Sequence, residues 1–166
     1  MRIARLTILI SLVALMLLPS VAQADDASVY GAYVSRDAEF GQLGKEFRSR
    51  WAAFTRSHST RNGRRVRATV KKTRTAIAEL SGAVAAQPSS SDNGKRAKAY
   101  ALKALKWFDS SQAAVASAVR SRLAGQLHDE AVWLRRSDAR FDASADNEHL
   151  ARRYFKRAGV QIKPAS

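Results

Sequence analysis

Two aspartates, Asp138 and Asp142, stand four residues apart in a stretch with helical spacing. On a helix this spacing puts both carboxylates on one face, where they could do acid–base work or hold a cation. Asp138 also interrupts an otherwise apolar stripe that consists of Leu127, Ala131, Leu134 and Phe141. We therefore keep an enzyme that uses these two carboxylates as one hypothesis. In so basic a chain, a salt bridge to Arg135 or Arg152 explains the same charges more simply.

The other residue types that carry out catalysis or bind metals form no recognised pattern. The chain has no cysteine, no Gly-x-Ser-x-Gly turn and no glycine-rich phosphate loop. It also lacks the Glu-x-x-His pairs of di-iron bundles, and Asp146 and His149 are a single pair with ligand spacing. His128, Asp129 and Glu130 are consecutive, so on a helix their side chains diverge by about 100° each. We expect no metal site, no cofactor and no enzymatic activity.

The densest cationic stretch, "RNGRRVRATVKKTRTA", runs from Arg61 to Ala76, and the first acid after it is Glu79. A helix that needs only solubility usually mixes acids with bases, because each i, i+4 pair stabilises it by about 0.2–0.5 kcal/mol. Here the cations instead form a ridge beside the apolar positions, which indicates an external anion. A merely solvated surface is the alternative. The anion-binding candidates are Arg61, Arg64, Arg65, Arg67, Lys71, Lys72 and Arg74.

Two amphipathic helices must position this ridge. The first is expected over residues 36–57, with Ser35 as its N-cap and an apolar stripe of Phe40, Leu43, Phe47, Trp51 and Phe54. Asn62-Gly63 predicts a turn, so the cationic stretch would begin in that turn and continue into a second helix over 64–86. The second helix has a heptad seam of Val66, Val70, Thr73, Ile77, Leu80 and Val84. Similar lengths and a short turn predict that these two helices form an antiparallel hairpin.

The rest of the chain also reads as helical. Residues 87–94 form a polar linker, a third helix begins near residue 95, and Gly125 is a point where that helix either breaks or continues. Asp146 is expected to cap a last short helix that stops at Gly159, followed by a tail over 160–166. No window alternates with the period of a strand. We therefore predict an all-α bundle of four to five helices forming one domain over 35–159. A long helical hairpin that pairs with a second copy is the rival architecture.

The N-terminus has the order of a secretory signal peptide. Arg2 and Arg5 precede an apolar run over 6–18, and Ala22-Gln23-Ala24 supplies small residues at a cleavage site. The run would span roughly 20 Å as a helix, too short for a hydrocarbon core of roughly 30 Å, which disfavours an uncleaved anchor. We expect cleavage after Ala24, an irregular segment over 25–34, no transmembrane segment in the mature chain, and a secreted or periplasmic protein, in a bacterium.

The net charge of the chain indicates what kind of partner it binds. The chain has 29 basic and 14 acidic side chains, and loss of Arg2 and Arg5 leaves 27 against 14, a net charge of +13. Export makes intracellular nucleic acid an unexpected partner. We expect a non-catalytic binding or structural role at the cell envelope, on an anionic polymer or a phospholipid surface. Extracellular DNA remains an alternative ligand. A second hypothesis is a helical module that docks an acidic exported protein or self-associates through its heptad seam.

Overall fold

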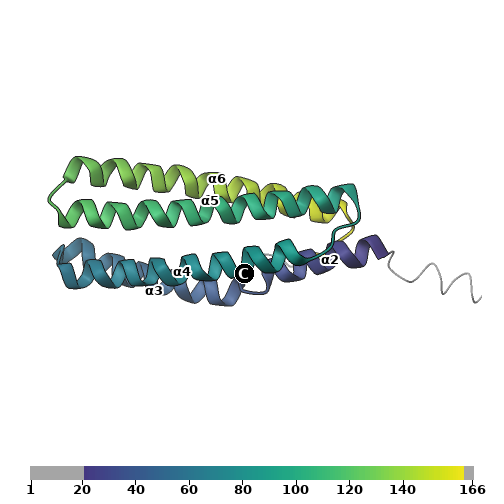
Figure 1. Ribbon diagram of the computed structural model, residues 1–166, viewed down its shortest axis with the longest axis horizontal. Helices are drawn as coiled ribbons and strands as arrows, with labels where there is room; N and C mark the ends of the chain where they lie inside the picture. The colour runs from purple at the N-terminus through teal and green to yellow at the C-terminus, as the bar shows by residue number, and fades with distance from the viewer. Residues whose placement is uncertain (1–20, 163–166) are drawn as a thin grey trace, which may run out of the picture.

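The computed structural model describes residues 21–162, and within that range α-helices joined by short connections are the only regular elements (Figure 1). This confirms the predicted all-α bundle of four to five helices. Residues 1–20, which make up most of the predicted signal peptide, and residues 163–166 lie outside the described range. The elements are α2 (Val21–Val34), α3 (Asp37–Ser57), α4 (Thr60–Ala86), α5 (Asp92–Leu123) and α6 (Leu127–Arg157). The predicted cleavage site at Ala24 lies within α2, and cleavage there stays a prediction.

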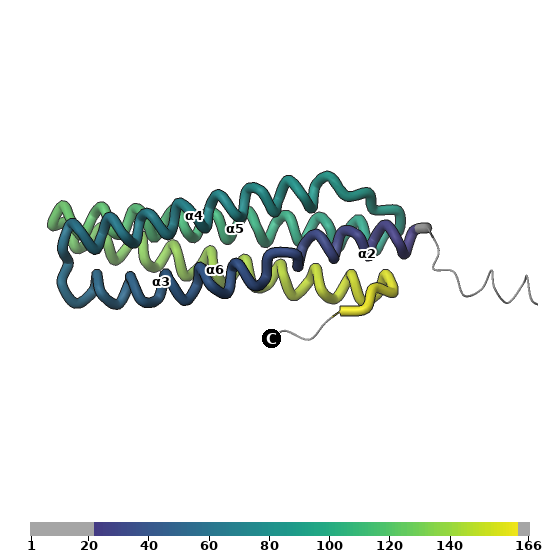
Figure 2. The backbone as a smooth tube through the Cα atoms, turned by 90° about the horizontal axis from the view of Figure 1, so that it is seen from below, coloured from purple at the N-terminus to yellow at the C-terminus, as the bar shows by residue number. Residues whose placement is uncertain are grey.

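The first two helical pieces, α2 and α3, continue each other as one bent helix (Figure 2). This corrects one expectation, since residues 25–34 are helical rather than irregular. The predicted hairpin of residues 36–57 with 64–86 is not confirmed as a pairing of the first two helices, because residues 36–57 form only the second part of the bent α2–α3 helix. Val29, Tyr30 and Tyr33 explain the helix, because their i, i+1, i+4 spacing gives α2 a buried face. Ser35 does not cap α3, since its hydroxyl donates back to the Ala32 carbonyl at 2.7 Å.

Helix α4 starts earlier than expected and lies alongside the α2–α3 helix. Thr60 is its first residue, and the Ser59 hydroxyl accepts a hydrogen bond from the Asn62 backbone N–H at 3.3 Å. Asn62-Gly63 therefore belongs to the helix, and the predicted turn there is wrong. The turn falls at His58 instead, which takes a left-handed φ of 46°. Gly63 is needed for packing, because a Cβ there would lie 2.8 Å from the Leu123 side chain.

The heptad seam of α4 is confirmed, since every one of its six residues is buried. At the end of the bundle near the α3–α4 turn, Val66 and Val70 pack with Phe54 and Val119. At the opposite end, the lower half of the seam, from Ile77 to Val84, packs in a second cluster with residues of α2, α5 and α6. The seam residues thus pack within one chain, so the seam is not available to pair with a second copy.

Gly125 ends the third helix. It has a φ of 76°, which L-residues rarely adopt, and the Gln126 N–H bonds to the Ser121 carbonyl at 2.8 Å. Helix α6 then runs without interruption to Arg157, so the expected short helix capped by Asp146 is wrong. Gly159, with a φ of 80°, stops α6 as predicted, and the Val160 N–H closes the motif on the Phe155 carbonyl at 3.0 Å.

Small side chains bring α5 and α6 close together. The hydroxyl oxygens of Ser111 and Ser137 lie 3.0 Å apart, and the Ser144 hydroxyl donates to the Ala104 carbonyl at 2.8 Å. These pairs step by seven residues in opposite directions along the two helices, as an antiparallel heptad contact requires. This contact runs past position 146, which is why α6 does not end where the sequence suggested a cap.

The linker is shorter than expected, because α5 already begins at Asp92. The serines of the linker bind the start of α2: the hydroxyls of Ser89 and Ser91 both donate to the fully buried carboxylate of Asp26. Gly94 makes room for this carboxylate, since a Cβ at Gly94 would overlap it. The linker therefore joins α2 to the N-terminus of α5, and Lys98 adds bonds to the Ala85 and Gln87 carbonyls at the end of α4.

Candidate functional site: a cationic groove between α4 and α5

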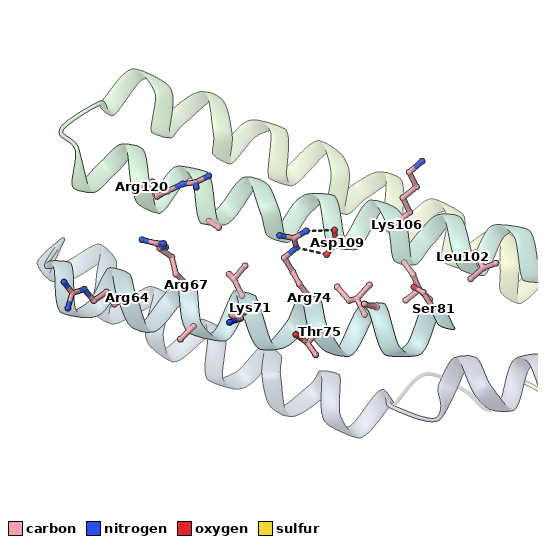
Figure 3. A pocket seen from close by; sticks show the side chains of 16 residues that line it. Arg64, Arg67, Lys71, Arg74, Thr75, Ser81, Leu102, Lys106, Asp109 and Arg120 are labelled. Atoms are coloured by element: carbon pink, nitrogen blue, oxygen red, sulfur yellow. Dashed lines mark hydrogen bonds and ion pairs between the residues drawn. The ribbon is translucent and has the colours of Figure 1, made fainter. Parts of the chain in front are cut away.

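A groove of about 1000 Å³ lies between α4 and α5. Four cations of the predicted ridge line it from α4, and two further cations, Lys106 and Arg120, line it from α5 (Figure 3). Asp109 is the one acid in its lining. Six cationic side chains and one acidic side chain give the groove a formal net charge of +5. The ridge is therefore one wall of a two-helix surface rather than an isolated helix face.

The seven candidate residues divide into two groups. Arg64, Arg67, Lys71 and Arg74 line the groove and are exposed. The other three, Arg61, Arg65 and Lys72, do not line it. The Lys72 ammonium lies 3.7 Å from the Glu46 carboxylate of α3, and the Arg65 carbonyl accepts a hydrogen bond from Arg50 at 3.2 Å. They differ because the groove faces α5, whereas Arg65 and Lys72 lie on the α3 side of α4.

Sequence reasoning missed Lys106 and Arg120. A signal was present, since Lys106, Asp109, Ala113, Ala116 and Arg120 follow one another at steps of three and four residues, which places them on one flank of α5. That flank becomes part of a site only through the pairing of α5 with α4, and the sequence pattern of α5 alone does not give its partner.

The cations of the groove have few internal partners. Within residues 21–162, Arg64, Arg67, Lys71 and Lys106 form no ion pair with another residue, and Arg120 bonds only to the Ser117 hydroxyl of its own helix, at 3.0 Å. Arg74 is the exception: its Nε and Nη2 donate to the two Asp109 carboxylate oxygens at 2.7 and 2.9 Å. This hydrogen bonding raises the pKa of Arg74 above its ordinary value. The positive potential of the groove therefore comes from charges that no acid of the described chain neutralises.

The floor of the groove is apolar. Val70, Ile77 and Leu105 lie beneath the cationic rim and are buried, and Leu102 is half-buried at one end. A guanidinium or ammonium group beside such a floor has less competing solvent on one side, which strengthens its attraction for an anion. The arrangement can therefore hold a ligand that combines negative charge with an apolar part.

The carboxylate pair that suggested an enzyme lies elsewhere. Asp138 and Asp142 are both exposed on α6, and Arg152 pairs with Glu148 rather than with either of them. The stripe containing Asp138 is not a core face, since Leu127 and Phe141 are 56% and 54% exposed. Small residues between these large positions, such as Ser137 and Ser144, instead make hydrogen bonds to α5. Asp138 therefore does not replace a buried residue.

Asp138 lines a second groove, of about 470 Å³, between α3 and α6. Most of the α3 stripe faces it, so Phe40, Leu43, Phe47 and Trp51 are only partly buried, and Phe54 alone is in the core. Phe47 and Trp51 stack with their ring centres 5.9 Å apart. This groove is mainly apolar, in contrast to the groove between α4 and α5.

A polar cluster also lies where the bent α2–α3 helix meets α6. Tyr33, Asp37, Glu148 and Arg152 line a small cavity of about 160 Å³ there. Burial raises the pKa of Tyr33 far above its ordinary value, and the Glu148 carboxylate adds to this effect. Burial also raises the pKa of Asp37. The cluster is mostly internally paired, because the Arg152 guanidinium bonds to Glu148 at 2.9 Å.

Among residues 21–162, no three His, Asp or Glu side chains are grouped so that they could hold a metal ion. None of the described helices combines the length and the apolar composition needed to cross a bilayer. Comparison of the chain with protein-family models, with curated proteins and with solved structures gave no match.

Proposed function

We propose that the protein is an exported, non-catalytic binding protein that contacts anionic components of the cell envelope through the groove between α4 and α5. The observation that carries this proposal is that six cations from two helices line one groove with a single acid. Charges that only keep a protein soluble have no reason to gather around one groove, and their mutual repulsion costs free energy. An anion bound among them would relieve that repulsion.

The proposal includes the cellular location. The signal-peptide pattern of the first 24 residues supports export, and the envelope offers phospholipids and phosphorylated polymers as anions. Arginine dominates the groove, with Arg64, Arg67, Arg74 and Arg120 against two lysines. A guanidinium matches the oxygens of a phosphate or carboxylate in a bidentate manner, which favours these groups as ligands.

Binding of the purified protein to vesicles that contain phosphatidylglycerol tests the proposal. The fraction bound should fall steeply as salt rises from about 50 to about 500 mM, because the Debye length shortens across this range. The double variant R67Q/R120Q removes two groove charges. It should weaken binding at low salt by about tenfold or more, given roughly 1 kcal/mol for each cation near an anionic surface.

The matched control is R135Q/R153Q, which removes two exposed charges from α6. Its net charge equals that of R67Q/R120Q. It should change binding by no more than about twofold. Binding that is insensitive to salt would contradict the proposal. Equal losses in the two double variants would show that overall charge, and not the groove, drives binding.

A further inference from the structure

The cationic groove differs between its two ends. Arg64, Arg67 and Arg120 lie at the end near the α5–α6 connection, whereas Ser81 and Leu102 lie at the opposite end (Figure 3). The lining near that opposite end also includes Ile77, Ala78 and Leu105, which carry no charge. One end of the groove is thus cationic and the other is largely apolar.

The Arg74–Asp109 bridge separates the two ends. It crosses from α4 to α5, and its two charges neutralise each other through a bidentate contact at 2.7 and 2.9 Å. Lys106 lies beyond the bridge, and Figure 3 shows its side chain extending away from α4. Arg67, which Figure 3 shows reaching toward α5, and Arg120 of α5 therefore place unneutralised charge on the side of the bridge away from Ser81.

This asymmetry has consequences for the ligand. A polymeric anion repeats its charge along its length and would gain from cations along the whole groove. A molecule with one anionic head and one apolar chain needs cations at one end only and an apolar surface beyond them. From Arg67 to Ser81, α4 rises about 21 Å, so the groove has room for an extended chain as well as a head group.

We propose that the ligand is an anionic amphiphile, with a phosphate-type head and a single alkyl or acyl chain. The head lies among Arg64, Arg67 and Arg120, and the chain passes the Arg74–Asp109 bridge to lie along Ala78 and Leu102. This inference rests on the proposed function, since it names the class of anion that the same groove binds. The inference goes beyond the proposed function because it requires the apolar end of the groove to hold the chain of the ligand.

Alkyl phosphates of increasing chain length, kept below their critical micelle concentrations, test the inference by titration calorimetry. Affinity should rise by about twofold for each added methylene, less than the roughly fourfold of full burial because a groove covers only part of the chain. Dodecyl phosphate should then bind on the order of a hundredfold more tightly than butyl phosphate. Inorganic polyphosphate serves as the polymeric probe and should gain nothing from the apolar end.

Two sets of variants locate the head and the chain. A78Q/L102Q makes the apolar end polar without changing charge, and it should abolish most of the dependence on chain length while leaving polyphosphate binding unchanged. R67Q/R120Q should weaken every anionic probe. L127Q, at an exposed leucine outside the groove, is the control for the loss of an apolar side chain. Thermal unfolding of each variant confirms that it is folded.

The outcomes separate the two proposals. Affinity that does not depend on chain length, with tight polyphosphate binding, would overturn the amphiphile inference and leave the proposed function standing. Chain-length dependence that survives A78Q/L102Q but is lost in F141Q would place the chain in the groove between α3 and α6, and would also overturn the inference. Absence of salt-sensitive binding to any anion would overturn both proposals.

Discussion

Helix α5 has two neighbours and meets them in different ways. At its closest contact with α6 it presents small residues such as Ala104 and Ser111, and the backbones approach closely enough for the Ser144 hydroxyl to reach the Ala104 carbonyl. Against α4 it presents longer side chains, and a groove of about 1000 Å³ lies between the two helices. Side-chain size at the contact determines the spacing of packed helices. The first contact gives the bundle its rigid pair, and the second provides the surface that can hold a ligand.

The two sides of α5 also differ in whether their charged groups have partners. A cation within the α5–α6 contact would lose its water without a partner, which is costly, whereas a cation beside an open groove keeps its water. Charged groups between α5 and α6 are accordingly paired: Arg122 bonds to Glu130 at 3.2 Å, and Arg140 donates to the Ser110 carbonyl at 3.0 Å. The groove side carries Arg67 and Lys71 without internal partners among the described residues.

The largest effect is expected from filling the close contact. Ala118 is fully buried one heptad beyond Ser111, so A118L should destabilise the protein by about 1–3 kcal/mol through overpacking. A78L, on the exposed groove side of α4, should change stability by less than about 0.5 kcal/mol. Urea unfolding of both variants measures this difference. Equal destabilisation would contradict the distinction between a close contact and an open one.

A smaller effect is expected from breaking the bridge across the groove. The side chains of Arg74 and Asp109 are 47% and 35% exposed, so D109N should lower stability by only about 0.2–1 kcal/mol. It should also tighten the binding of an anionic probe severalfold, because Arg74 is released and an acid is removed. Unfolding and probe titration on the same sample check both parts. Weaker binding in D109N would mean that the bridge shapes the site rather than limiting its charge.

Local patterns in the sequence predicted the fold best where they involve one helix at a time. The α4 seam and the stop at Gly159 follow from residue spacing and from glycine chemistry. Helix α2 was missed because its polar start and Gly31 resemble an irregular segment. The formation of α2 depends on contacts with distant residues, such as the hydrogen bonds from Ser89 and Ser91 to the buried Asp26 carboxylate.

The apolar stripes noted in the sequence on α3 and α6 lie largely outside the core. Phe141 is exposed and Trp51 lines the groove between these helices, because the pattern of one helix does not give the partner that covers it. The candidate site was half predicted for a similar reason. The ridge on α4 can be derived from spacing, whereas Arg120 joins it only through the pairing of two helices.

The central claim is that the groove between α4 and α5 is where an anion binds. Mapping the amide chemical shifts of isotope-labelled protein during titration with dodecyl phosphate tests it most directly. The account predicts that the largest shifts fall on residues 64–81 of α4 and 102–120 of α5, and that exposed Arg135 and Arg153 of α6 are nearly unaffected. Shifts spread evenly over all the arginines, or centred on the groove between α3 and α6, would contradict it.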